Sequence, residues 1–260
     1  MTMLKIGRHA VEVYDDIETL PIVRFHKYNK MLLVDAGIGS DMADFDRHIE
    51  RAMRYATSKT PDQTVKELNN LRQSVYMIQT ELSPRHLAFA ALVKAIDGKP
   101  RDDISDDGLR ETAAMLNDAP IKDMTTSIEA VKKKIDDALQ QYFPKVFDDT
   151  SIKEYYDILR RRTLLILEAI IKGAEPSKEV DKLTTELLLY SKPQVFDGEE
   201  SLEVEHDKRF DRMCMTISQH LHVDPKRYTV LEYYNAFEYI KEMSKEAQKK
   251  AADRKKGSRR

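Results

Sequence analysis

The sequence predicts an all-α fold, with one or more bundles of about 8 to 10 amphipathic helices. Only 8 glycines and 9 prolines occur in 260 residues, whereas folds rich in β-turns need more of both. Charged residues make up 34% of the chain, a proportion that helix surfaces accommodate. Apolar residues also recur at the three- and four-residue spacing of one helix face. We therefore expect amphipathic helices that pack together.

The chain opens with the one extended segment that its pattern predicts, Val11–Tyr14. Its brief alternation of apolar and polar residues favours a short strand or an extended arm. Thr19 and Pro21 predict the cap and first-turn proline of a helix that ends at about Val34. Three further helices are expected to begin at Ser40, at Thr60 with Pro61, and at Ser83 with Pro84. The last of them is expected to end at Gly98.

Two of these helices carry an apolar face at helical spacing. The stripes consist of Met42, Phe45, Ile49 and Met53 in one helix, and of Val65, Leu68, Leu71, Val75 and Ile78 in the next. Short loops between such helices favour antiparallel neighbours. Residues 1–98 are therefore predicted to form an N-terminal helical unit.

The second part of the chain is also predicted to be helical. Helices are expected near residues 106–117, around Ile128–Leu139, and over 152–171, 178–190, 201–221 and 229–250. The acidic, turn-rich stretch DGKPRDDISDDGLRE separates them from the first unit. The predicted domains are a middle helical unit over 99–193, a C-terminal helical hairpin over 194–247 and a basic disordered tail over 248–260.

Charge and cysteine content indicate the class of protein. The net charge is −2, so the whole chain does not attract nucleic acid. Its single cysteine, Cys214, cannot form an internal disulfide, which fits a reducing compartment. The first residues lack the apolar core of a signal peptide. The most apolar run, Thr163–Ile171, is far shorter than the ~20 residues that span a bilayer. A cytosolic protein without membrane contact is expected.

Two loops have the composition of ligand sites. Asp35–Asp41 (DAGIGSD) has two glycines before a helix, as in some phosphate loops, but lacks the further glycine and the lysine of those motifs. Asp103–Gly108 (DISDDG) resembles the start of a calcium loop, yet Ala114 falls at the position of the required bidentate carboxylate. Helix ends explain both loops better, with Ser105 as an N-cap in the second.

The remaining reactive side chains do not form a recognisable active site. His206, His220, His222 and Asp224 lie near one another in sequence, and Cys214 lies among them. Neither the HExxH spacing nor a second cysteine accompanies them. The adjacent arginines 160–162 spread over most of a helix turn, which favours a solvated or salt-bridged face. The sequence therefore predicts no catalytic, cofactor-binding or metal-binding residues, and a protein that is not an enzyme.

The last predicted helix carries the most patterned surface of the chain. Its apolar stripe comprises Val230, Tyr233, Tyr234, Phe237 and Ile240. Aromatic residues often anchor interfaces, but a stripe of this kind can equally pack on its own core, and both interpretations stay open. If it docks a partner, the contact residues are Tyr233, Tyr234, Phe237 and Ile240, with accessory basic residues in the tail: Arg254, Lys255, Lys256, Arg259 and Arg260.

Two segments carry a resemblance to proteins of tailed bacteriophages. The proline turn followed by TVLEYYNAFEYIKE (Thr229–Glu242) and a basic end resembles the C-terminal segment of small helical proteins of phage tail modules. Leu20–Asp41 (LPIVRFHKYNKMLLVDAGIGSD) is similar to phage proteins from gut bacteria. The resemblance implies a tail assembly chaperone or related morphogenesis protein that shields the hydrophobic tape measure protein.

The predicted function is thus a non-enzymatic protein-interaction factor in phage morphogenesis. Its partners would be the tape measure protein or other tail components, with self-association left open, in the cytoplasm of a bacterial host. The first alternative is a structural component of the virion, in the neck, the tail or the interior. The second is a helical protein that associates weakly with nucleic acid through its basic tail.

Overall fold

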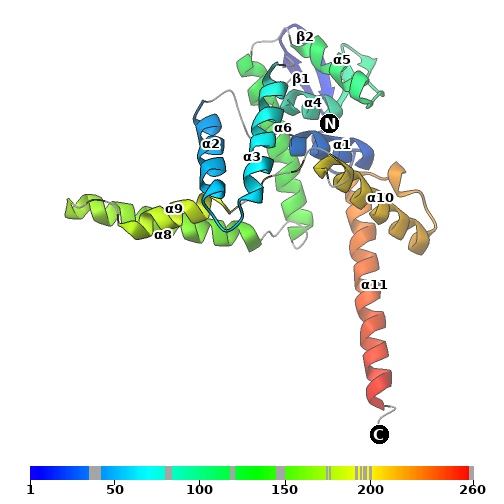
Figure 1. The fold of residues 1–260 in the computed structure, drawn as a ribbon. Helices are drawn as coiled ribbons and strands as arrows, with labels where there is room; N and C mark the ends of the chain where they lie inside the picture. Colours follow the sequence, from blue (N-terminus) through cyan, green and yellow to red (C-terminus); the bar gives the residue numbers. More distant parts are fainter. Residues whose placement is uncertain are drawn as a thin grey trace. The chain divides into compact units, whose positions relative to one another are not determined.

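The computed structural model describes residues 1–34, 42–79, 84–117, 121–144 and 150–257, apart from short gaps between 174 and 200. Within these residues the fold is dominated by helices, as predicted, and it also contains a small antiparallel sheet (Figure 1). Contacts divide the chain into two compact units. Unit 1 comprises residues 1–33, 84–144 and 204–260, and unit 2 comprises 34–83 and 145–203.

The elements of unit 1 are β1 (Thr2–Ile6), β2 (His9–Val13), α1 (Ile22–Val34), α4 (Pro84–Leu92), β3 (Val93–Ile96), β4 (Lys99–Pro100), α5 (Asp106–Leu116), α6 (Ile121–Tyr142), α10 (Leu202–Leu221), a 3-10 turn η1 (Pro225–Arg227) and α11 (Val230–Gly257). The elements of unit 2 are α2 (Met42–Ala56), α3 (Asp62–Gln79), α8 (Thr150–Lys172) and α9 (Lys178–Leu188). Both units are thus assembled from segments distant in sequence, whereas the predicted domains were consecutive stretches of chain.

The sheet of unit 1 corrects the all-α prediction. Its strands are antiparallel in the order β1-β2-β3-β4. The segment from Pro84 was predicted to remain helical up to Gly98, but α4 ends at Leu92 and β3 pairs with β2. Asp97 and Gly98 both have positive φ, 51° and 76°, as in the tight turns that Asp-Gly pairs form in hairpins. The glycine therefore joins two strands and does not terminate a helix.

One predicted cap of unit 1 is confirmed, at Ser105, and one is wrong: the Thr19 hydroxyl donates to Asp16, and α1 begins only at Ile22. Ser105 precedes α5, and its hydroxyl accepts a hydrogen bond from the Gly108 N–H at 3.2 Å. The helix interpretation of the acidic DISDDG loop is thereby confirmed. Thr229 and Glu232 form a reciprocal capping box at the start of α11, with distances of 3.3 and 2.9 Å. α1 is helical up to Val34, the position of the predicted helix end, and the residues that follow it lie outside the described part of the chain.

The core of unit 1 is apolar and draws on both the sheet and the helices. Its buried side chains include Ile6, Val11, Val13, Leu92, Ile96, Ile135, Ile217 and Val230. The backbone of α11 is tied to the N-terminal segment, because the N–H groups of Val230 and Leu231 donate to the carbonyls of Leu20 and Ile17. The last helix and the first strands therefore belong to one structure.

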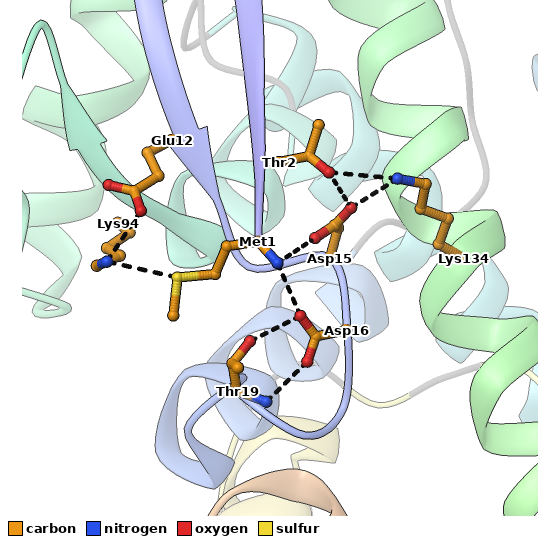
Figure 2. A network of polar contacts seen from close by, with 8 residues as sticks. All are labelled: Met1, Thr2, Glu12, Asp15, Asp16, Thr19, Lys94 and Lys134. Atoms are coloured by element: carbon orange, nitrogen blue, oxygen red, sulfur yellow. Dashed lines mark hydrogen bonds and ion pairs between the residues drawn. The ribbon is translucent and has the colours of Figure 1, made fainter.

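A polar network at one end of the sheet also joins distant segments (Figure 2). The buried Asp15 carboxylate accepts hydrogen bonds from Lys134 Nζ of α6 at 2.6 Å and from Thr2 Oγ1 of β1 at 2.5 Å. It also forms an ion pair with the Met1 amino group at 2.9 Å. Burial alone would raise the pKa of Asp15, but these contacts outweigh it and hold the pKa below its ordinary value.

Candidate interaction surface and binding pocket

The structure places the predicted aromatic stripe of α11 largely inside unit 1. Tyr233 and Ile240 are buried, with exposed fractions of 5% and 7%. Tyr234 packs on Phe143, the residue after α6, with ring centroids 5.4 Å apart, and Phe237 is half-buried. Of the two interpretations left open, the core role fits this placement. Partner binding by these residues stays a prediction.

The basic segment behind the stripe was predicted to be disordered from residue 248. Instead, the backbone of α11 continues as a helix to Gly257. Arg254, Lys255 and Lys256 therefore lie on a helix, although their side chains are outside the described residues. Arg259 and Arg260 are outside the described residues altogether, as is the glycine loop at 35–41.

Unit 2 buries polar side chains beside apolar ones such as Tyr55 and Leu71. Glu67 of α3 is fully buried, with 0% of its surface exposed. Its carboxylate lies 2.5 Å from His48 Nδ1 and 3.6 Å from Arg51 Nη2, both on α2. Asn70 of α3 is also buried. The contact between α2 and α3 is therefore built in part on charged and amide groups.

The exterior of unit 2 is correspondingly apolar. On α2 and α3, the exposed apolar residues are Ile49, Met53, Val65, Leu68 and Val75, members of the two stripes that the sequence analysis identified. On α8, they are Leu164, Leu167, Ile170 and Ile171, with exposed fractions of 51%, 49%, 69% and 84%. We call these four residues the α8 stripe. Side chains of this size are usually buried, so their clustered exposure marks an interaction surface.

The three adjacent arginines of α8 take different roles. Arg161 pairs with Glu179 of α9 at 2.5 Å, which confirms the salt-bridged interpretation for this residue. Arg162 Nε donates to Thr184 Oγ1 of α9 at 2.7 Å. Arg160 is exposed. The three side chains thus point in different directions, as their spacing predicted.

Arg162 also lines a half-open pocket of about 530 Å³ within unit 2. The lining comes from α2, α8 and α9 and consists of Arg47, Arg51, Tyr155, Leu159, Arg162, Thr184, Leu187 and Leu188. Three of these described residues are cationic and none is acidic. The sequence did not predict this site. The pocket combines two arginines one helix turn apart on α2 with a third arginine that lies more than 100 residues later. The i, i+4 spacing of Arg47 and Arg51 was the one available signal.

A histidine cluster in unit 1 has the side chains of a metal site. His26 of α1 and His206 and Asp207 of α10 bring their ligand atoms within 4.8 Å of one another. His26 Nε2 lies 2.8 Å from Asp207 Oδ1, and Lys30 Nζ lies 2.6 Å from Oδ2. The two imidazoles stack almost in parallel, at 8° and 4.3 Å. A metal bound to an imidazole nitrogen lies near the plane of that ring, so one ring would have to turn before both could bind it.

The same cluster has low proton affinity. Burial, followed by the nearby His26, lowers the pKa of His206 to about 4. Burial also lowers the pKa of His26, although the hydrogen bond to Asp207 opposes this effect. Phe210 stacks on His26 at 4.1 Å and contacts Tyr233 at 5.9 Å. Nothing in the sequence indicates that His206 meets His26, because His26 lies 180 residues away.

Comparisons with known proteins identify no relative of this chain. No family model, no curated protein and no solved structure matches it. Among the helices that the structure describes, none combines the length and the apolar character needed to cross a membrane.

Proposed function

We propose that this protein is a non-enzymatic protein-interaction factor that binds partners through the apolar exterior of unit 2. One observation carries the proposal: the α8 stripe is exposed while charged Glu67 is fully buried in the same unit. Burying apolar surface stabilises a contact by roughly 25 cal/mol per Å². A surface of this kind gains most when another protein covers it.

The spacing of the α8 stripe favours a helical partner. Leu164, Leu167 and Ile171 follow one another at intervals of three and four residues, the spacing at which two helices interlock along a seam. Arg160 and Glu168 flank this seam and are exposed, so they are available for charge pairing at its edges. The occupant is an apolar helical segment of another protein.

The resemblance of two segments to phage tail-module proteins supplies the biological setting of the proposal. In that setting the partner is the hydrophobic tape measure protein, and the role is that of a tail assembly chaperone. An exterior that is apolar before assembly supports this role, because a chaperone must hold apolar segments that would otherwise aggregate.

The decisive experiment coexpresses the protein with the tape measure protein of a tailed phage. The double variant L167Q/I171Q removes the C-terminal part of the seam, and M215Q in unit 1 is its control, because Met215 is 63% exposed. We expect wild type and M215Q to keep the tape measure protein soluble and to coelute with it, and L167Q/I171Q to lose both.

Two results would count against the proposal. Unfolding of L167Q/I171Q would mean that these side chains are part of the folded core. Equal coelution of all three proteins would place the partner elsewhere. Mass spectrometry of purified particles separates the chaperone from the virion component, because only the latter is retained in stoichiometric amounts.

A further inference from the structure

We propose that His26 of α1 and His206 and Asp207 of α10 bind a divalent transition-metal ion such as Zn²⁺. Among the described residues, these three bring their ligand atoms within 4.8 Å of one another. Two imidazoles and one carboxylate are a donor set that zinc uses in proteins, with water in the fourth position. The site lies in unit 1, whereas the α8 stripe belongs to unit 2, so this inference does not depend on the proposed partner contact.

Two of the donor atoms are close to the separation that a metal requires. Zinc ligands stand about 2.0 to 2.2 Å from the ion, which places two donors of a tetrahedral site roughly 3.3 to 3.6 Å apart. His26 Nε2 lies 2.8 Å from Asp207 Oδ1, so these atoms now share a proton. Replacement of that proton by an ion requires the pair to open by less than about 1 Å.

The third ligand is a side chain with an unsatisfied nitrogen. His206 Nδ1 is buried and has no hydrogen-bond partner among the residues that the structure describes. Such a group is uncommon in folded proteins, because it has lost its contacts with water and gained none. The His206 ring stacks on His26, so it must turn about its Cβ–Cγ bond to bind the ion. This turn gives up the stacked contact but no hydrogen bond at Nδ1.

Lys30 leaves the ligand oxygen of Asp207 accessible. Its Nζ donates to Oδ2 at 2.6 Å, whereas His26 faces Oδ1. The lysine therefore holds the carboxylate by its other oxygen, as the outer partners of metal ligands do. The side chain of Asp207 is 44% exposed, which gives a water ligand access to the ion. Because the ammonium group also repels a cation, we expect weaker binding than at a structural site with four protein ligands.

Titration of the untagged, EDTA-treated protein with Zn²⁺ at pH 7 tests the proposal, by isothermal titration calorimetry. We expect one ion to bind per chain. Co²⁺ is the second probe, and it should develop the visible absorption of a tetrahedral site, which is far stronger than that of the hydrated ion. Ca²⁺, which prefers six to eight oxygen ligands, should not compete with Zn²⁺.

Residues of the same helix provide matched variants. H206F keeps an aromatic ring but removes a ligand, and D207N keeps the shape of the carboxylate but makes it a poorer ligand. H220F and D211N are the controls, because His220 is exposed and Asp211 pairs with Lys226 at 2.9 Å. Loss of an outer partner alone costs about 10- to 100-fold in metal affinity, so we expect each ligand variant to weaken Zn²⁺ binding at least about 10-fold. The controls should change it less than about 3-fold.

Three results would overturn the inference. Folded wild type that shows no saturable binding of Zn²⁺ would exclude the site. Equal weakening by H206F and H220F, or by D207N and D211N, would show that the ion binds histidines and acids regardless of their place. Competition by Ca²⁺ at the same concentration as Zn²⁺ would show a carboxylate site without imidazole ligands.

Two further variants keep these results interpretable. D207N decides the question if H206F does not fold, because Asp207 is partly exposed. L167Q/I171Q should bind Zn²⁺ as wild type does, so loss of partner capture and loss of metal binding are separate outcomes.

Discussion

The two units of this protein differ in how they distribute polar and apolar side chains. Unit 1 buries branched and aromatic side chains such as Phe89 and Ile217, together with the charged Arg24. Unit 2 buries Leu71 together with the charged Glu67, and it exposes Leu164 and Ile171. Buried charges are weak sources of stability. Unit 2 thus leaves large apolar side chains uncovered on α8, the surface on which the proposed partner contact depends.

The largest expected effect tests the core of unit 1. Phe89 of α4 is 1% exposed, and replacement of a buried Phe by Ala removes its contacts and leaves a cavity. We expect F89A to lower the free energy of unfolding by about 3 to 5 kcal/mol, as measured by urea denaturation followed by circular dichroism. A loss below about 1 kcal/mol would show that unit 1 does not depend on its apolar interior.

The buried carboxylate of unit 2 should matter through its charge. E67Q keeps the shape of Glu67 but removes the negative charge that faces His48 and Arg51. We expect it to destabilise unit 2 by about 1.5 to 3 kcal/mol, the range for hydrogen bonds to charged groups. Hydrogen exchange should locate the loss in α2 and α3. E50Q is the control, because Glu50 is half exposed on the neighbouring helix α2, where it also pairs with an arginine, Arg54.

The histidine stack should make unit 1 sensitive to acid. The folded pKa of His206, about 4, is below its unfolded value, so the unfolded chain binds more protons between pH 6.5 and 4. Stability should therefore fall as the pH falls through this window, by about 1 to 2 kcal/mol after allowance for partial exposure. H206F preserves an aromatic ring and should flatten this part of the stability profile. H220F, at an exposed position, should leave the profile unchanged.

The smallest expected effect concerns the α8 stripe. I171Q replaces a side chain that is 84% exposed, so we expect its free energy of unfolding to stay within about 0.5 kcal/mol of wild type. Comparison of I171Q with F89A tests the difference between the two units, because both variants replace an apolar residue in a helix, one exposed and one buried. A loss comparable to that of F89A would remove the distinction between the two units.

Local signals in the sequence predicted local structure well. Ser105 and Thr229 begin helices because their hydroxyls satisfy the first free N–H groups, and this depends on a few adjacent residues. The stretch from Pro84 to Ile96 was misjudged for the opposite reason. Its short apolar run is compatible with helix or strand. Its last four residues form a strand because they pair with β2, some 80 residues away.

Long-range arrangement could not be read from pattern alone. The apolar stripes through Ile49, Met53, Val65 and Leu68 were recognised, but periodicity does not tell whether a face is covered or exposed. The pocket and the histidine stack share a second difficulty. Arg51 with Arg162, and His26 with Asp207, meet only in the folded chain, and single-sequence spacing carries no information about such encounters.

The interrupted path of unit 1 has a consequence for biosynthesis. Val230 and Leu231 supply backbone hydrogen bonds to Leu20 and Ile17, so the first strands leave the ribosome long before the helix that completes them. Both segments of unit 2 are translated by residue 203. At about 5 to 20 residues per second, unit 2 is complete seconds before α11 is available. The nascent chain thus presents the α8 stripe while unit 1 is still open, and a partner can be captured during translation.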